Sequence, residues 1–157
     1  MRITAKVDYA VRAAVELART HPADGSRPEP VTRQHLAEAQ AIPAKFLEHI
    51  LRDLKRSGLV GSLRGADGGY WLQRSPDDIS VADVIRAVEG PLADVRGVRP
   101  DGLDYPDDLA ALQRAWIALR ANLRAVLEQV SVGDLCRGEL PPSVEALAEP
   151  ADAWLSH

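Results

Sequence analysis

Three polar side chains with defined hydrogen-bonding roles lie close together in the chain. Lys45 donates, Glu48 accepts and His49 can donate. Their offsets of 0, 3 and 4 place them on one face if the segment is helical. A fourth polar side chain, Arg64, precedes the glycine-rich stretch "GADGG", which Tyr70 follows. Such groups could bind an anion or read the polar edges of a partner, depending on the elements that hold them.

No catalytic constellation accompanies these side chains. The sequence shows no Ser-His-Asp setting, no carboxylate pair with a cleft signature and no metal motif, and its four histidines are dispersed. The stretch "GADGG" could be a nucleotide cradle, but it lacks the following helix and the Lys-Ser/Thr pair of a P-loop. We therefore predict that the protein is not an enzyme; a small hydrolase is the least supported hypothesis.

The segment around Lys45 has the pattern of two consecutive helices. Thr32 can cap a short helix over residues 33–39, and Pro43 suits the first turn of a second helix. Gly58 ends the second helix as a residue of the C′ type. A short helix, a turn and a longer amphipathic helix form a helix-turn-helix. The apolar stripe of the second helix consists of Leu47, Ile50, Leu51 and Leu54.

A β-hairpin is predicted directly after this motif. Leu59 to Arg64 and Tyr70 to Gln73 have the pattern of two strands around a glycine-rich turn. A helix-turn-helix followed by a hairpin is a winged helix, and the hairpin is its wing. The glycines, among them Gly68 and Gly69, allow positive φ and a close backbone approach. Tyr70 would anchor the far strand by packing or by contacting a phosphate.

Further helices flank the winged helix. Thr4 can cap a helix from about residue 5 to 20, and Ser80 with Asp83 forms a capping-box variant that opens another helix. Gly90-Pro91 ends that helix, and residues 92–106 are irregular. The predicted fold is mainly α with a small β-hairpin wing and a long dimerisation helix. We divide the chain into a winged helix-turn-helix (1–75), a connecting helix and loop (76–106), a dimerisation helix region (107–135) and a tail (136–157).

The segment 107–130 contains neither glycine nor proline and carries a heptad pattern. The same apolar seam would suit a helix packed on its own domain. A winged helix this small offers little core for such a helix to cover, so we favour a homodimer. The predicted seam consists of Leu109, Leu112, Trp116, Leu119, Leu123, Val126 and Val130. In the tail, "SVGDL" predicts a capped turn, Trp154 could dock, and the last residues should fray.

Charge is distributed unevenly along the chain. Residues 1–75 carry 12 Lys and Arg against 8 Asp and Glu, whereas residues 76–157 carry 7 against 15. A basic front half suggests a polyanionic partner, although chance clustering on solvated faces gives the same count. No apolar run approaches 18 residues and no signal peptide opens the chain, so we expect a cytoplasmic protein without membrane contact.

The sequence resembles the Rrf2 (Rrf-two) family of bacterial winged-helix transcription regulators, relatives of IscR, NsrR and CymR. The resemblance rests on "MRITAKVDYAVRAAVELA", "FLEHILRDLKRSGLVGSLRGADGGYWL", "ISVADVIRAVEGPL" and "VSVGDL", and covers about residues 1–135. It implies a dimeric, sequence-specific DNA-binding regulator, in our interpretation a repressor, acting on a palindromic operator of double-stranded DNA. The alternative is a dimeric winged-helix protein-interaction module that does not bind DNA.

The resemblance also assigns roles to individual residues. Lys45, Glu48 and His49 correspond to base readers in the major groove, and Arg64 of the wing would enter the minor groove. An ion pair between Glu48 and Arg52 is the alternative role for Glu48. Predicted contacts to the DNA backbone come from Arg2, Lys6, Arg33, Lys55, Arg56, Gly68, Gly69 and Tyr70.

Two departures from the family lie in and near the helix-turn-helix turn. Members commonly have Gly-Ile-Ser where this chain has Ala41-Ile42-Pro43. Pro43 lacks a hydroxyl that resembles a DNA contact in relatives, and Phe46 replaces a common tyrosine. Base preference is therefore expected to differ.

The third departure concerns the sensor. Cluster-binding relatives carry three cysteines after "RAVEG", whereas residues 92–109 contain neither cysteine nor histidine, and Gly97 stands where the first cysteine would fall. Asp8 matches a carboxylate ligand of some relatives, but without thiolates we expect a capping or ion-pairing role. Cys136, the single cysteine, is predicted to be a free, half-buried thiol. We predict no iron–sulfur cluster, no metal and no other cofactor. An unknown small-molecule effector, bound between the winged domain and the long helix, or a protein partner could supply the signal.

Overall fold

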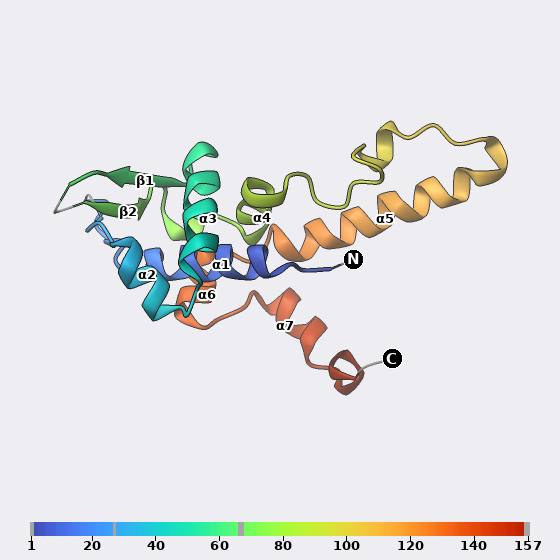
Figure 1. The fold of residues 1–157 in the computed structure, drawn as a ribbon. Helices are drawn as coiled ribbons and strands as arrows, with labels where there is room; N and C mark the ends of the chain where they lie inside the picture. The colour runs from blue at the N-terminus through green and yellow to red at the C-terminus, as the bar shows by residue number, and fades with distance from the viewer. Residues whose placement is uncertain (1, 27, 66–67, 156–157) are drawn as a thin grey trace.

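The computed structural model describes residues 2–26, 28–65 and 68–155. Figure 1 shows a helical body with a two-stranded hairpin at one end and a long helical arm that projects from the other. The elements are α1 (Ala5–Ala18), α2 (Arg33–Ala39), α3 (Ala44–Arg56), β1 (Val60–Leu63), β2 (Gly69–Leu72), α4 (Val81–Glu89), α5 (Ala110–Leu127), α6 (Val132–Arg137) and α7 (Pro142–Ala148).

The helix-turn-helix lies where the sequence predicts it. Thr32 accepts a hydrogen bond from the His35 N–H and caps α2, which has the predicted bounds. Pro43 is the N-cap of α3 rather than its first helical residue. The first helix ends at Ala18, slightly before the predicted residue 20, and Thr4 caps it by accepting from the Val7 N–H.

The wing is a two-stranded antiparallel sheet in which Val60 faces Leu72 and Leu63 faces Gly69. The first strand is shorter than predicted, because Leu59 and Arg64 lie outside it, and the second has the predicted length but begins and ends one residue earlier. Val31 adds a short third partner on the free edge of β2. The N–H groups of Val31 and Tyr70 each donate to the other residue's carbonyl at 2.8 Å.

The core forms around α1, which packs against α2, α3, α4 and α6. Small residues on α1, such as Ala10 and Ala13, let these helices approach closely. Each buried leucine or isoleucine of the predicted α3 stripe contributes about 1.5–3 kcal/mol to stability. The largest fully buried side chains include Leu17, Leu36, Leu47, Ile50, Leu54, Leu72 and Val132.

The long helix α5 leaves the body and the chain then returns to it. Residues 107–109 form a short 3-10 turn before α5, and the helix ends at Leu127. The Val81 N–H donates to the Val130 carbonyl at 2.9 Å, and the Val132 N–H donates to the Ile79 carbonyl at 2.8 Å. The predicted helix over 107–130 is therefore too long, because its last residues pair with the body. Within the described ranges, no helix is both long and apolar enough to cross a membrane.

The region after residue 130 is more ordered than the sequence predicts. Ser131 and Asp134 form a capping box that opens α6, so the boundary placed at 135/136 falls inside a helix. The proline-rich segment begins α7, and a 3-10 turn follows over Ala151–Trp154. Trp154 is 79% exposed, and its indole N–H donates to the carbonyl of Ala148 at the end of α7. Residues 156–157, for which fraying was predicted, lie outside the described part of the chain.

Candidate nucleic-acid interface

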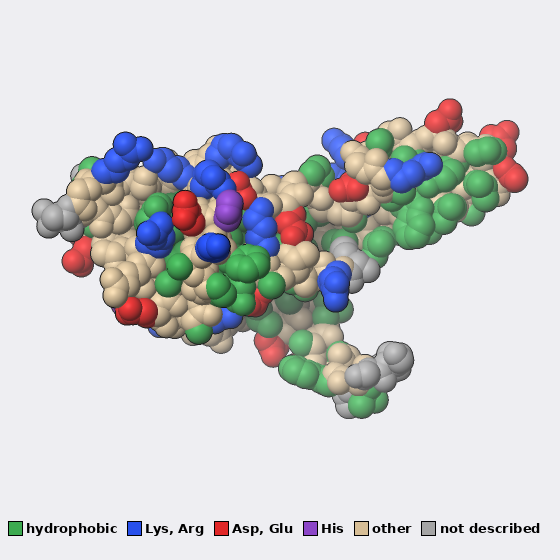
Figure 2. Space-filling view, in the orientation of Figure 1, with side chains coloured by type: hydrophobic (Ala, Val, Ile, Leu, Met, Phe, Trp, Pro, Cys, Tyr) green, Lys and Arg blue, Asp and Glu red, His purple; other side chains and the backbone are tan. Residues whose placement is uncertain are grey.

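The outward face of α3 carries the predicted hydrogen-bonding set. Leu47, Ile50, Leu51 and Leu54 are buried, so the helix is fixed with its opposite face towards solvent. Lys45, Glu48 and His49 are all exposed on that face. Figure 2 shows Lys and Arg side chains gathered over the same end of the molecule, across the region of α3 and the wing. The surface therefore combines directional polar groups with positive charge.

Two of these side chains have partners within the chain. Glu48 lies 3.7 Å from the Arg33 guanidinium, and both are exposed, so the ion pair is weak. The sequence-based alternative paired Glu48 with Arg52, but Arg52 instead contacts Nδ1 of His49. Arg52 was absent from the predicted site, although its position on the exposed face of α3 already placed it there. Lys45 has no hydrogen bond or ion pair with a described residue.

The orientation of α3 depends on polar contacts between α1 and the turn before α3. The Gln40 amide donates to Glu16 Oε2 at 2.7 Å, and the Arg12 guanidinium donates to the Gln40 carbonyl. Glu16 also forms an ion pair with Arg19 and lies 3.3 Å from the His35 ring. Sequence analysis missed these residues, although Arg12 and Glu16 share one face of the first helix. They hold the turn that sets where α3 begins.

The turn itself contains a left-handed residue. The Ile42 N–H donates to the Ala37 carbonyl and the Ala41 N–H to the Glu38 carbonyl, which is the Schellman pattern. Ala41 occupies the C′ position with φ +50°, where glycine is the usual residue. Gly58 occupies the equivalent position after α3 with φ +78°. Ala41 is thus a strained residue at the junction that orients α3.

Lys6 is not a free cation on this surface. Its ammonium donates to Asp53 at 2.8 Å and to the Val88 carbonyl at 2.6 Å, which ties α1 to α3 and α4. The hydrogen bond from Lys6 holds the pKa of the Asp53 carboxyl below its usual value, and Arg56, 3.2 Å away, acts in the same direction. Lys6 therefore serves the fold, which weakens the predicted phosphate contact; Arg56 remains highly exposed.

Arg2 lies apart from α3. It is exposed and lines a cavity of about 310 Å³ where α1, α4 and α5 meet, together with apolar residues such as Val7 and Leu123. This is the region between the winged domain and the long helix in which an effector pocket was predicted. Among the described residues, Arg2 has no recorded contact with α3 or the wing.

The wing presents an exposed arginine at the end of its first strand. Arg64 is exposed at the end of β1 and has no hydrogen bond or ion pair with any residue that the structure describes. Lys55 reaches the same strand, where its ammonium donates to Ser62 Oγ at 2.7 Å. Lys55 therefore joins the end of α3 to the wing and remains exposed.

The wing glycines serve two different purposes. Gly65 has φ +111°, which a residue with a Cβ rarely adopts. Gly68 and Gly69 do not have positive φ; a Cβ on them would lie 2.5 Å from the Leu63 carbonyl oxygen and 2.6 Å from the Val31 carbonyl oxygen, respectively. Tyr70 is half-buried and packs on the core, which agrees with the packing role predicted for it. Residues 66–67 lie outside the described part.

The long helix α5 offers an apolar surface without a partner. None of its 18 residues is buried, and Leu119 is 42% exposed. Figure 2 shows hydrophobic side chains along one side of the arm. Leu109, at the start, is also exposed, whereas Trp116, Leu123 and Val126 are half-buried. Val130 is only 5% exposed and packs within its own chain, so its inclusion in the seam was wrong.

The segment between α4 and α5 lacks the donors of a metal centre. No group of three or more His, Cys, Asp or Glu side chains that could hold a metal is present among the described residues. Asp8 pairs with Arg12 at 3.2 Å, which confirms the ion-pairing role. Iron–sulfur clusters need mainly thiolate ligands, and residues 92–109 contain none. The residues present do not fit a cluster there.

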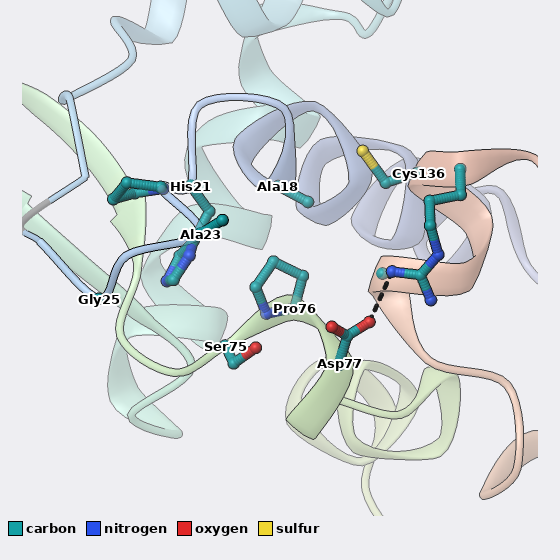
Figure 3. Close-up of a pocket in the computed structure, with 11 residues that line it drawn as sticks. Ala18, His21, Ala23, Gly25, Ser75, Pro76, Asp77 and Cys136 are labelled. Carbon is teal, nitrogen blue, oxygen red and sulfur yellow. Dashed lines mark hydrogen bonds and ion pairs between the residues drawn. The ribbon is translucent and has the colours of Figure 1, made fainter.

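The single cysteine, Cys136, is half-buried on α6, as predicted. It lines a cavity of about 340 Å³ shared with Ala18, His21 and Pro76. Figure 3 shows this cavity with Asp77 paired to Arg137 at its edge. Arg137 also contacts Asp134 and Glu139, so three carboxylates surround its guanidinium. Cys136 is remote in sequence from residues 92–109, which contain no cysteine.

The fold and the surface of α3 define a winged helix-turn-helix protein. The chain belongs to the Rrf2 family, since residues 3–138 match the family model described as "Iron-dependent Transcriptional regulator". It is therefore an HTH-type transcriptional regulator by family and not an enzyme. This confirms the resemblance inferred from the sequence.

Named relatives support the same family. Rv1287 of Mycobacterium tuberculosis, named as an HTH-type transcriptional regulator, is 46% identical over 149 residues, which cover 95% of this chain and 89% of the relative. CymR of Bacillus subtilis is 33% identical over 86% of this chain and 89% of its own. IscR of Klebsiella pneumoniae is 31% identical over 88% of this chain and 82% of its own.

Solved structures show the same fold. The structure of CymR, the global cysteine regulator of B. subtilis, superposes with a TM-score of 0.70 at 31% identity, covering 88% of this chain and 98% of that one. IscR of T. potens superposes with a TM-score of 0.66 at 29% identity, covering 99% of this chain and 97% of that one.

Proposed function

We propose that this chain is a homodimeric, sequence-specific DNA-binding repressor that works without an iron–sulfur cluster. The observation that carries the proposal is the exposed face of α3 with Lys45, Glu48 and His49, together with the exposed Arg64 of the wing. A helix of this kind fits the major groove of B-DNA, and its side chains then meet the base edges.

Each proposed base reader has a distinct chemistry. Lys45 donates to guanine O6 and N7 or to a phosphate, and Glu48 accepts from cytosine N4. His49 donates to a base acceptor once Arg52 turns towards a phosphate. Arg64 enters the minor groove, where the potential is most negative over A·T-rich sequence. Arg33 releases Glu48 at little cost because their ion pair is exposed.

Contacts to phosphates position the protein on the duplex. Arg33, Lys55 and Arg56 are exposed around α3 and keep this proposed role, and Arg52 joins them. Gly68 keeps its proposed contact through the wing backbone, whereas Gly69 and Tyr70 lose support because Gly69 is buried and the Tyr70 N–H and carbonyl both pair with Val31. Arg2 and Lys6 lose support, since Arg2 lies elsewhere and Lys6 is held by Asp53. Such contacts carry affinity but little sequence information.

Dimerisation follows from the unpartnered surface of α5. Leu112 and Leu119 are exposed on a helix with no buried residue, so a second copy of the chain would bury them. Two copies related by a two-fold axis present two α3 helices, and a palindromic operator matches that symmetry. A dimer bound at a promoter would block access of RNA polymerase to it, which makes the protein a repressor. Its site of action would be the cytoplasm.

Fluorescence anisotropy with labelled duplexes tests the proposal at one fixed salt concentration. The duplex from the chain's own upstream region should bind more tightly than a scrambled duplex. Lys45→Ala and Glu48→Ala should each lower specific affinity by about 1–3 kcal/mol, as expected for base readers. Arg114→Ala, an exposed arginine on α5, is the matched control and should have little effect. A wild-type protein that binds neither duplex would favour the protein-interaction module instead.

A further inference from the structure

A cavity of about 270 Å³ lies between α5 and the 3-10 helix η2 (Pro100–Gly102), which lies in the segment between α4 and α5. Three arginines line it, Arg99 before the turn and Arg120 and Arg124 on successive turns of α5. The Gln113 amide holds the turn against α5 by donating to the carbonyls of Pro100 and Leu103. The cavity is therefore built by two elements that are fixed to each other.

The charges around the cavity do not balance. Asp101 is the one carboxylate among its described lining residues, and Arg99 binds it with two hydrogen bonds of 3.1 and 2.9 Å. Arg124 donates to Glu128 outside the cavity. Arg120 lies 4.0 Å from Asp101 Oδ1, too far for a hydrogen bond. One guanidinium is thus left without a close anionic partner.

Arg120 also carries an unsatisfied donor. Its Nε atom is buried and has no hydrogen-bond partner, and it is the one such side-chain atom among the residues that the structure describes. The side chain as a whole is 22% exposed. A buried N–H without an acceptor lowers stability, and the loss is larger when the group is charged. The Nε–H itself is closed off from the cavity, so an acceptor there would meet the terminal N–H groups of the Arg120 guanidinium, whose nearest carboxylate oxygen is 4.0 Å away.

We propose that this cavity binds a small oxyanion, a phosphate or a carboxylate, with Arg120 as its principal ligand and Arg99 and Arg124 at its rim. The planar guanidinium fork matches the oxygens of both groups. Residues 76–157 contain more than twice as many acidic as basic residues, so three arginines around one cavity are not expected from the composition of this half of the chain.

The position of the cavity favours a free small anion over DNA. Figure 1 shows α5 and the turn before it at the opposite end of the molecule from the wing. Arg120 and Arg124 are also not positions of the apolar seam on α5, so the proposed dimer does not need this face. The anion would link the η2 turn to α5 and so stabilise the segment between α4 and α5.

Thermal unfolding and calorimetric titration of the full-length protein test the site without DNA. Sodium phosphate and sodium malonate are each compared with sodium chloride at equal ionic strength and fixed protein concentration. At about twenty times the Kd, a specific anion should raise Tm by about 4–7 °C. Phosphate alone raising Tm identifies a phosphate ligand, and malonate alone a carboxylate ligand.

Arg120→Met should abolish this shift and, in chloride, be at least as stable as the wild type, because the unsatisfied donor is gone. Arg114→Met, an exposed arginine on the same helix, should keep the full shift. An equal shift in Arg120→Met, or no saturable binding of either anion below about 10 mM, would overturn the proposal. So would a loss of operator affinity in Arg120→Met, since that would make the anion a DNA phosphate. The unfolding and calorimetric outcomes do not depend on the proposed base readers.

Discussion

Replacing Ala41 by glycine should stabilise the protein. Ala41 closes the Schellman motif after α2 with φ +50°, a conformation that costs a residue with a Cβ roughly 1–2 kcal/mol. Glycine avoids this cost but loses more conformational freedom on folding, which offsets about 0.4–1 kcal/mol. Ala41 is exposed and its side chain has no core packing to lose. The expected net gain is therefore about 0.5–1 kcal/mol.

Urea unfolding at a fixed protein concentration measures this gain, because a dimer's stability depends on concentration. A rise in Tm of about 1–4 °C should accompany it. Two variants serve as controls. Gly58→Ala makes the reverse change at the same motif position after α3 and should lose about 1 kcal/mol. Ala39→Gly, in the last right-handed residue of α2, should lose about 0.5–1 kcal/mol.

The comparison between Ala41→Gly and Ala39→Gly carries the test. If both substitutions destabilise the protein equally, Ala41 does not occupy the left-handed region in solution. If Gly58→Ala has no effect, the cost assigned to this motif position is wrong. Either result would refute the reasoning.

Four further predictions follow from the site. Anaerobically purified protein should be colourless and free of stoichiometric iron; visible charge-transfer absorption would contradict this. Leu119→Asp should yield monomers by light scattering and lose operator binding, and a monomeric wild type at micromolar concentration would exclude the proposed dimer. Arg64→Ala should weaken specific DNA binding by about 1–3 kcal/mol, whereas Lys55→Ala should weaken specific and random DNA alike and reduce the salt slope by about one; equal losses on both DNAs for Arg64→Ala would make it a phosphate contact. Arg124 and Arg86 hold the pKa of Glu128 at about 2, below the ordinary 4.5, so its contribution is present above pH 4.5 and disappears as pH falls towards 2. The stability deficit of Glu128→Gln should shrink over that range, and a deficit independent of pH would exclude an ionic origin.

Local sequence signals predicted most of the winged helix. The capping residues Thr32 and Ser80 interact with the backbone of the same turn, so their effect does not depend on the rest of the fold. The α3 stripe and the glycine-rich hairpin were predicted for the same reason, since helix and strand periods are visible within a short window. The positions of Lys45, Glu48, His49 and Arg64 on the surface followed from these elements.

Contacts between distant segments could not be predicted in this way. Val130 continues the heptad count along the sequence, yet it pairs with Val81 because the chain turns back to the body after α5. The sequence predicts Lys6 as a phosphate contact, but the fold brings Asp53 and the Val88 carbonyl within hydrogen-bonding distance of its ammonium. The α7 helix was missed because its proline-rich start resembles a loop, although proline is well tolerated in a first helical turn.

The sequence by itself determined the family, the winged helix-turn-helix and the outward face of α3, because periodicity, caps and turn residues act over a few positions. The tertiary structure alone decided which cations are free, since pairing depends on segments far apart in the chain. Arg64 and Lys6 are both basic residues whose partners cannot be read from the sequence. In the structure Arg64 is exposed without a described partner, whereas the Lys6 ammonium donates to two acceptors. The burial of the Arg120 Nε–H without an acceptor is likewise a property of the folded chain, and the sequence gives no sign of it.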